Sequence, residues 1–425
     1  MNKRIVISGS CRTPVGKSGG TRGNLSSLSA VELLVPCFEE TLNRSGVAKD
    51  KLDQVIVGNC AQSSDAPNIS DVAGRSLQFL RRDVAEEAAE ISGIHVPAFS
   101  VNRNCGSGLQ AVVSACQMLK AEEANIVLAG GTESMSNIPY ISRDMRFGHG
   151  LGHSQFIDAL WEGLTDPITG EKMGETAENI AERYKISRED QDEFAAQSHQ
   201  KAFRAMREGK FRSQIVPLET GGKKVFQDEG INQALTRQHL SLYPERVFFV
   251  KGGTVHAGNS CSISDGASSF LVLTLPEALR RGIKPEAEIL GYAFEACNPS
   301  YMGMGPYYAI PKALSIADVC LGDVDLFEIN EAFAAQVLGC QRELGIPLDK
   351  LNVWGGAIAL GHPVGATGAI LTTKLIAMLK DIAGLYGVVS MCIGGGQGGA
   401  MVIKNWKTEF LDPLKQGQET TPSEE

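Results

Sequence analysis

The sequence predicts an α/β fold made of two similar halves, and three observations support that prediction. Short apolar runs alternate with longer stretches of helical period, which is typical of sheets covered by helices. Features of the first part of the chain recur in the same order near its end. Glycine accounts for 47 of the 425 residues, and many of these glycines lie where an apolar run meets a helical stretch.

The apolar runs are short and continuous, which indicates strands buried on both faces, and we expect them to form parallel sheets. They cover residues 4–8, 54–58, 125–129, 270–275, 288–292, 325–329, 387–392 and 400–404. Helical periodicity predicts helices over 30–44, 107–121, 332–344 and 367–381. The charged stretch 174–211 is also predicted to be helical, with Ser187 at a helix start.

The internal repeat sets the predicted domain limits. Residues 52–59 resemble residues 324–330, a CGSG segment opens one predicted helix as a GATG segment opens another, and each helix leads to a strand that ends in glycines. We therefore predict two duplicated halves separated by an inserted loop domain, and a disordered polar tail. The limits are 1–125 for the first half, completed by part of 250–284, then 126–250 for the insertion with a strand at its start, 285–406 for the second half and 407–425 for the tail.

Composition excludes several classes of protein. There are 40 Lys and Arg against 49 Asp and Glu, and the net charge of −9 argues against a nucleic-acid partner. The ten cysteines contain no CxxC pair, which argues against a disulfide scaffold or a zinc ribbon and fits a reducing compartment. The apolar run at residues 5–7 is too short for a signal peptide, and no run approaches the ~18 apolar residues of a membrane span. We expect a cytoplasmic enzyme.

Three motif matches fail for lack of context. Cys11 stands where a phosphate-binding loop ending at 16–18 needs its first glycine. The glycines at 394–399 lead into a strand, not the helix that a dinucleotide site needs. His149 and His153 have metal-ligand spacing, but the glycines around them favour a loop, and no third ligand is evident.

Cys105 is the first candidate catalytic residue. In residues 102–108 (NRNCGSG) it lies at a predicted strand-to-helix turn. Free N–H groups and the helix dipole at such a position stabilise a thiolate, which makes the thiol nucleophilic. The alternative is a buried structural cysteine, but the polar, glycine-rich flanks argue against it.

His362 lies between Gly361 and Pro363 on a loop before a helix. A histidine in that position could accept the proton of a thiol or donate a hydrogen bond to a carbonyl oxygen. The alternative is a core histidine bonded to backbone.

Two further segments complete the set. Cys392 precedes a glycine run at a strand end, where it could act as a second acid or base while the glycine N–H groups form an oxyanion site. The alternative is a glycine-rich turn with an incidental thiol. Asn330 lies at a strand-to-helix junction and could hold a water, or it could cap the helix. Two thiols, a histidine and an asparagine among backbone donors suit acyl transfer through a thioester.

With these motifs in view, the chain resembles the thiolase family, which includes acetyl-CoA acetyltransferases and 3-ketoacyl-CoA thiolases. The resemblance extends from about residue 3 to 404 and rests on motifs in the family's order. These are RTPVGKSGG at 12–20, NCGSG at 104–108, NEAF at 330–333, GHPVG at 361–365 and CIGGG at 392–396.

The resemblance implies a five-layered αβαβα fold of two duplicated halves with an inserted loop domain. It implies that Cys105 carries the acyl group, that His362 activates it and forms one oxyanion hole with a water held by Asn330, and that Cys392 moves the α-carbon proton. The N–H groups of Cys105 and Gly394 would form the second oxyanion hole. The implied reaction is thiolysis of a 3-oxoacyl-CoA, or the reverse condensation of two acetyl-CoA, with no metal or redox cofactor.

The resemblance also implies a substrate site formed by Met173, Ser260, Cys261, Met302 and Phe333; the alternative for Met173, Met302 and Phe333 is ordinary core. Departures from the family pattern concern coenzyme A. Cys261 stands where Ser is common, and Lys172 stands where His is frequent. Asn232 stands where Arg is usual, so we expect Arg237 or another base to compensate for the missing charge. The chain is also longer between residues 66 and 96 than in short-chain members.

The resemblance implies a homodimer or homotetramer, with a partner subunit of β-oxidation as a further option. A ketoacyl-synthase-like condensing enzyme shares the fold, but Asn330 together with Cys392 disfavours it. A non-catalytic acyl-CoA or lipid-binding member is the alternative from another class, and the two thiols with His362 argue against it.

Overall fold

The computed structural model describes residues 3–18, 23–79, 96–244 and 249–407. In these ranges, one large sheet runs in the order β12-β13-β14-β11-β1-β10-β5-β3-β4, with β2 paired to β10. Its strands are β1 (Ile5–Arg12), β2 (Gly16–Ser18), β3 (Gln54–Gly58), β4 (Ala98–Val101), β5 (Ile126–Ser134), β10 (Ile263–Thr274), β11 (Ala287–Ala296), β12 (Leu326–Ile329), β13 (Tyr386–Ile393) and β14 (Gln397–Asn405).

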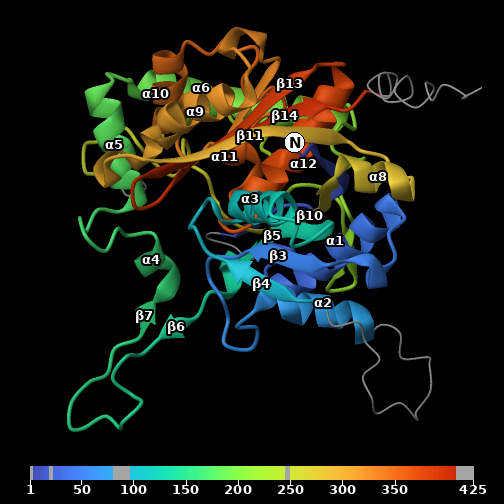
Figure 1. The fold of residues 1–425 in the computed structure, drawn as a ribbon. Helices are drawn as coiled ribbons and strands as arrows, with labels where there is room; N and C mark the ends of the chain where they lie inside the picture. Colours follow the sequence, from blue (N-terminus) through green and yellow to red (C-terminus); the bar gives the residue numbers. More distant parts are fainter. Residues whose placement is uncertain (1–2, 19–22, 80–95, 245–248, 408–425) are drawn as a thin grey trace, which may run out of the picture.

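Helices cover the outer face of each half of this sheet, and two more helices lie between the halves. Counting the two halves as two β layers gives the layer order αβαβα (Figure 1). The central layer consists of α3 (Ser107–Lys120) and α12 (Thr367–Asp381), which pack against each other. One outer layer contains α1 (Ala30–Ser45), α2 (Ile69–Phe79) and α8 (Leu275–Arg281). The other contains α9 (Gly305–Ala317) and α10 (Ala334–Leu344).

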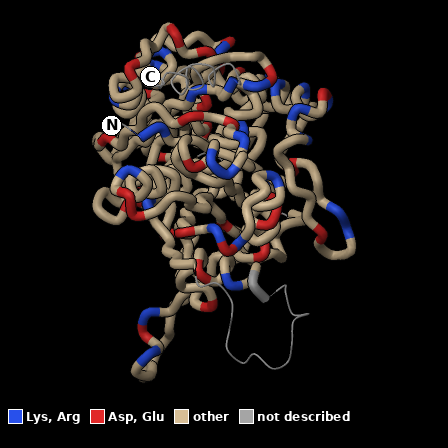
Figure 2. Tube along the Cα trace, turned by 45° about the vertical axis from the view of Figure 1, so that its right-hand side comes forward, with Lys and Arg blue, Asp and Glu red and all other residues tan. Residues whose placement is uncertain are grey.

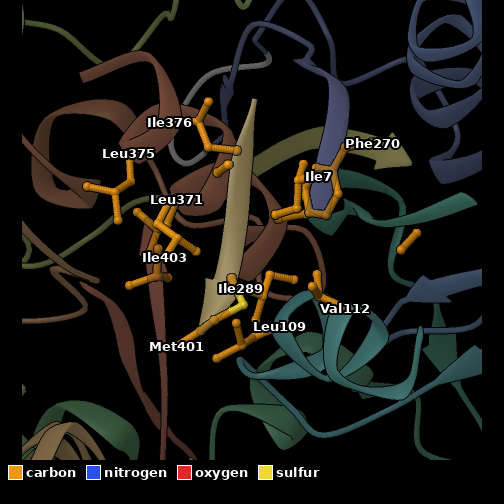
Figure 3. Close-up of a cluster of buried hydrophobic side chains, with 14 of the residues drawn as sticks. Ile7, Leu109, Val112, Phe270, Ile289, Leu371, Leu375, Ile376, Met401 and Ile403 are labelled. Carbon is orange, nitrogen blue, oxygen red and sulfur yellow. The ribbon is translucent and has the colours of Figure 1, made fainter. Parts of the chain in front are cut away.

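The two halves of the sheet meet at a short seam. Strands β1 and β11 pair antiparallel through Ile5–Ile289, Val6–Glu288 and Ile7–Ala287. Figure 3 shows the apolar core at this seam, where Ile7 and Ile289 lie with Leu109 of α3 and Leu371 of α12. Side chains from both halves therefore share one core.

The predicted duplication is visible in matched hydrogen bonds. Asp53, before β3, accepts from the N–H groups of residues 125 and 126 at the start of β5, over 2.7 and 3.0 Å. Asp325, before β12, accepts in the same way from residues 385 and 386 at the start of β13, over 2.6 and 3.0 Å. In the first half β3 runs parallel to β5, and in the second half β12 runs parallel to β13. Each aspartate therefore joins the two strands of a parallel pair.

The prediction of parallel sheets is wrong for most of the strand pairs. Strand β3 runs parallel to β4 and β5, and β12 runs parallel to β13, but the other neighbours in the large sheet are antiparallel. An antiparallel strand normally shows polar residues on one face. Here helices cover both faces, so antiparallel strands such as β1, β10 and β13 are buried along nearly their whole length, as parallel strands are.

The segment between β5 and β10 contains small elements beside the large sheet. They are β6 (Tyr140–Ile141), β7 (Ile157–Asp158), α4 (Ala159–Gly163), α5 (Met173–Arg183), α6 (Arg188–Arg207), β8 (Leu218–Thr220), β9 (Lys223–Val225) and α7 (Arg237–Ser241). Ser187 caps α6 as predicted, with its side chain accepting from the N–H of Asp190 over 3.1 Å. Strand β5, at the start of the predicted insertion, belongs to the large sheet.

Acidic and basic residues are interspersed along the described chain (Figure 2). None of the helices in the described ranges is long and apolar enough to cross a membrane. Apart from Lys407, the tail predicted at 407–425 lies outside the described residues, as do residues 80–95 of the long segment before β4.

Candidate active site

Cys105 lies in a tight turn between β4 and α3. The turn is closed by hydrogen bonds from the N–H of Gly106 to the carbonyl of Arg103 (2.9 Å) and from the N–H of Ser107 to the carbonyl of Asn104 (3.0 Å). The Cys105 side chain is half-buried. Burial raises the pKa of its thiol, and hydrogen bonds from the N–H groups of Gly394 and of Cys105 itself oppose that rise. Both backbone N–H groups therefore favour the thiolate form of Cys105.

His362 lies between the short helix α11 (Ala357–Leu360) and α12. The loop before a helix is as predicted, but the histidine follows a short helix and not a strand. Its Nδ1 lies 2.6 Å from Oγ1 of Thr367, and its backbone N–H donates to Oγ of Ser264 over 3.2 Å. Burial lowers the pKa of His362 to about 4, so the imidazole is neutral at neutral pH and can accept a proton.

Asn330 directly follows β12, and its side chain faces His362. Its Nδ2 lies 3.4 Å from Nε2 of His362, a long contact, while its buried Oδ1 has no hydrogen-bond partner among the described residues. Helix α10 begins only at Ala334, with Phe333 as N-cap, so Asn330 is not the cap of that helix. An unsatisfied buried amide oxygen beside an imidazole fits a site that holds a water or a substrate atom.

Cys392 is the penultimate residue of β13, and 1% of its surface is exposed. It belongs to an apolar cluster with Met302, Ala332 and Phe333. Burial is the main cause that raises its pKa well above the ordinary value, and the nearby Cys105 sulfur adds to it. The Cys392 thiol is therefore protonated at neutral pH and can donate a proton.

Glycines allow the Cys105 and His362 segments to meet. A Cβ atom on Gly368, in the first turn of α12, would lie 2.2 Å from the backbone nitrogen of Leu109 in α3. A Cβ atom on Gly108 would lie 2.9 Å from the carbonyl oxygen of Gly365. Because only glycine permits such close backbone contact, the N-terminal turns of the two central helices touch and carry both segments to the same end of the fold.

Glu133 is a site residue that the sequence did not single out. This buried carboxylate, near the end of β5, accepts from the side chain of Asn59 and from the N–H groups of Cys60, Ala61 and Gly365 over 2.9–3.2 Å. It thereby links the loop after β3 to the loop that carries His362. A single charged residue near the end of an apolar strand was the available signal, but its partners lie far away in the sequence.

A cavity of about 540 Å³ has His362 on its wall, whereas Cys105, Asn330 and Cys392 are not among its lining residues. Its lining includes Met173, Ser260, Cys261, Phe333 and His362, so it gathers most of the predicted substrate residues.

Two of the predicted substrate residues lie elsewhere. Met302 is in the apolar cluster around Cys392 and not on the cavity wall. Arg237 is exposed at the start of α7, outside the cavity lining, so its expected role as the compensating base stays a prediction. Among the described Lys and Arg residues, Lys17 and Lys172 line the cavity.

The described residues contain no group of three or more His, Cys, Asp or Glu side chains arranged to hold a metal ion. In particular, His149 pairs with Asp144, with Nδ1 and Oδ2 3.1 Å apart.

Comparison with known proteins identifies the family. Residues 5–275 match the family described as "Thiolase, N-terminal domain", and residues 283–405 match "Thiolase, C-terminal domain". The chain belongs to the thiolase family. The resemblance read from the sequence motifs is confirmed, and the chain is an acyltransferase of this family.

Similar proteins agree over nearly the whole chain. A "Probable acetyl-CoA acyltransferase" of Staphylococcus aureus (strain COL) is 41% identical over 410 residues, covering 95% of this chain and 100% of its own. The crystal structure of the Bacillus anthracis acetyl-CoA acetyltransferase superposes with a TM-score of 0.89 at 38% identity, covering 96% of this chain and 100% of its own. Human mitochondrial 3-ketoacyl-CoA thiolase, in complex with CoA, gives 0.87 at 39% identity, covering 95% and 98%.

These similarities confirm the predicted α/β thiolase fold. They favour a thiolase over a ketoacyl-synthase-like condensing enzyme and over a non-catalytic binding protein of the same fold.

Proposed function

We propose that this thiolase transfers an acyl group between a 3-oxoacyl-CoA and CoA, and in reverse condenses two acetyl-CoA, through an acyl group on Cys105. One observation carries the proposal. The backbone N–H groups of Gly394 and Cys105 favour the thiolate of Cys105, while a neutral His362 and a protonated Cys392 lie at the same end of the fold. A nucleophile, a base and an acid are thus available together.

The first half of thiolysis breaks a carbon–carbon bond. As the sulfur of Cys105 attacks the 3-oxo carbon, its proton passes to His362, and the carbonyl oxygen becomes an oxyanion. Collapse of this intermediate breaks the bond between C2 and C3 and leaves an acyl group on Cys105. The departing enolate of acetyl-CoA takes the proton of Cys392, whose raised pKa suits donation.

The second half transfers the acyl group to CoA. The CoA sulfur attacks the acyl carbon as its proton passes to the Cys392 thiolate that the first half leaves. The Cys105 sulfur departs and regains its proton from His362. The N–H groups of Cys105 and Gly394 would stabilise the oxyanion of this step, because a thioester carbonyl on Cys105 lies next to the position that the sulfur now occupies. His362 and a water on Asn330 would stabilise the oxyanion of the other substrate.

The cavity lined by Met173, Ser260, Cys261 and Phe333 is the proposed channel for the CoA thioester. Its apolar walls suit an acyl or pantetheine chain. Lys17 and Lys172 are better placed than Arg237 to meet the phosphates of CoA, since both line the cavity. CoA is then a substrate, and the proposed chemistry uses this chain's own thiols and imidazole without a metal or redox cofactor.

The proposed compartment is the cytoplasm, because all ten cysteines are free thiols, which suits a reducing environment. The proposed assembly is a homodimer or homotetramer. Exposed apolar side chains on the segment between β5 and α5 support it, among them Phe147, Leu151, Phe156 and Ile168. Light scattering of the purified chain tests this assembly, and a monomer that associates only with a β-oxidation partner subunit would replace it.

The test of the reaction is to incubate the protein with acetoacetyl-CoA and CoA and to follow the loss of the enolate absorbance. Absence of turnover with every 3-oxoacyl-CoA tried would overturn the proposal. Labelling with acetyl-CoA, followed by mass spectrometry, should place the acetyl group on Cys105, and a Cys105→Ala protein should not acquire it. Rates over a series of acyl chain lengths then define the preferred substrate.

A further inference from the structure

Asn104 connects the turn that carries Cys105 to the segment that follows Cys392. Its side-chain Nδ2 donates a hydrogen bond to the carbonyl oxygen of Gly394 over 2.9 Å. Asn104 directly precedes Cys105, and Gly394 begins the turn between β13 and β14, two residues after Cys392 of β13. The bond therefore joins residues 290 positions apart in the sequence.

The backbone of Asn104 is held so that its side chain has a defined direction. Its φ of 46° lies in the left-handed region, where asparagine is tolerated better than most residues. Its N–H donates to Oδ1 of Asn102 over 2.9 Å. Its carbonyl accepts from the N–H of Ser107 and from the thiol of Cys60, over 3.0 and 2.9 Å. Three neighbouring groups thus fix the residue.

Gly394, in contrast, begins a run of three glycines. Gly395 and Gly396 have φ values of 87° and 82°, which glycine adopts readily, and such a run has many accessible backbone conformations. The N–H of Gly394 nevertheless opposes the rise in the pKa of the Cys105 thiol, which places it near that sulfur. Among the described residues, Asn104 is the side chain that donates to the carbonyl oxygen of Gly394.

We propose that Asn104 is a positioning residue for the oxyanion site, which keeps the Gly394 N–H directed at the carbonyl of the acyl group on Cys105. This inference rests on the proposed thiolase reaction. Preorganised backbone donors contribute to catalysis because they need no reorientation when the oxyanion forms. Without the Asn104 amide, the glycine run would sample conformations in which this donor points elsewhere.

Two variants test the inference. Asn104→Gly keeps the left-handed backbone and removes the amide, and Asn104→Asp keeps the shape but replaces the donor with an acceptor. Lys185→Gly is the matched control, because Lys185 is an exposed residue with a left-handed φ of 52°. Two rates are measured for Cys105 in each protein: acylation by acetyl-CoA, which forms an oxyanion, and alkylation by iodoacetamide, which does not.

We expect the ratio of acylation to alkylation to fall about tenfold in both Asn104 variants, less than the 10²–10³ typical of deleting an oxyanion donor itself, and to stay unchanged in Lys185→Gly. A loss of stability alone would lower both rates together, so an unchanged ratio overturns the inference, whatever the absolute rates. If the unmodified protein is not acylated at all, the proposed function fails instead. The two failures are therefore distinguishable.

Discussion

The carboxylate of Glu133 in β5 accepts the N–H of Gly365, over 2.9 Å, and so connects the first half of the molecule to the loop that carries His362. Three more donors, from the side chain of Asn59 and the N–H groups of Cys60 and Ala61, converge on the same two oxygens. Burial raises the pKa of Glu133, and these N–H donors oppose the rise because they favour the charged form.

Replacing Glu133 with Gln should therefore destabilise the fold and slow the reaction. The amide would turn an NH₂ group toward backbone donors, leaving buried N–H groups unpaired, at a cost of about 2 kcal/mol in the free energy of unfolding. Because Gly365 lies three residues from His362, kcat should fall more than KM changes. Urea denaturation measures the first effect, with the exposed Glu343→Gln as a neutral control. A Glu133→Gln protein with the parental urea midpoint would contradict this role.

The stability of the protein should depend on pH through two buried histidines. Burial lowers the pKa of both His362 and His199 to about 4 from an ordinary 6.5. The unfolded chain therefore binds more protons than the native state between pH 6.5 and 4, so the free energy of unfolding falls as the pH falls through this window. Each histidine contributes on the order of 3 kcal/mol to that fall.

A His199→Gln protein tests this pH dependence. In the parent protein the N–H of Asn232 donates to Nδ1 of His199 over 3.1 Å, and the side-chain oxygen of the new Gln can still accept it. The Gln amide does not titrate in this pH range. The variant's free energy of unfolding should fall less than that of the parent between pH 6.5 and 4. The exposed His153→Gln serves as the control and should follow the parent. Parallel curves for all three proteins would show that His199 is not held neutral by burial.

Asn330 should determine when His362 is protonated. With Nδ2 of Asn330 3.4 Å from Nε2 of His362, an Asn330→Asp carboxylate would stabilise the imidazolium and raise the pKa of His362 above about 4. The acid limb of Cys105 acylation should then move to higher pH, as measured by single-turnover rates. Asn330→Ala adds no charge, so it should leave the acid limb in place. It should instead slow thiolysis of acetoacetyl-CoA by about a hundredfold, because the enolate oxyanion loses the water held by Asn330. An acid limb at the same pH in Asn330→Asp would refute the coupling.

The strands could be predicted from the sequence because burial on both faces leaves an apolar run, but that same burial concealed their direction. Strand β4 and helices α2 and α9 were not predicted. Helix α9 contains Pro306 in its first turn and Pro311 in its interior, residues that normally argue against a helix. The internal repeat predicted the two similar halves more reliably than the apolar runs predicted strand direction, because Asp53 and Asp325 accept equivalent backbone hydrogen bonds in the two halves.

The site residues could be predicted where a reactive side chain and the glycines around it lie in one short segment. Cys105, His362 and Cys392 each lie beside glycines that the backbone contacts require. Glu133 acts through residues 59–61 and 365, which fold against it from distant parts of the sequence, so no local pattern marks it. Arg237 was chosen by charge and nearness in sequence, and its exposed position on α7 shows that neither determines which side chains reach the cavity.

Cys392 should be needed for breaking and forming the carbon–carbon bond but not for acylation of Cys105. A Cys392→Ala protein should still acquire an acetyl group from acetyl-CoA, whereas its thiolysis of acetoacetyl-CoA should fall at least about a hundredfold, because the enolate loses its proton donor. Cys340→Ala is the matched control, since Cys340 is also fully buried in the second half and its thiol donates to the carbonyl of Gly303 over 3.3 Å. Equal loss of thiolysis in the two variants would mean that Cys392 is a core residue.

Contact between the central helices should limit which residue can occupy position 368. A Cβ atom on Gly368 would lie 2.2 Å from the backbone nitrogen of Leu109, and backbone cannot move aside as a flexible side chain can. Gly368→Ala should therefore separate the first turns of α3 and α12, at a cost of about 3 kcal/mol, and slow acylation by moving Cys105 away from His362.

Gly322→Ala is the control for this substitution, because a Cβ atom there meets nothing within 4 Å. It should leave both the free energy of unfolding and the acylation rate close to those of the parent. Denaturant titration and single-turnover acylation of the two variants give the comparison. If Gly368→Ala unfolds at the parental denaturant concentration and acylates at the parental rate, the close approach of the two helices is not what brings Cys105 and His362 together.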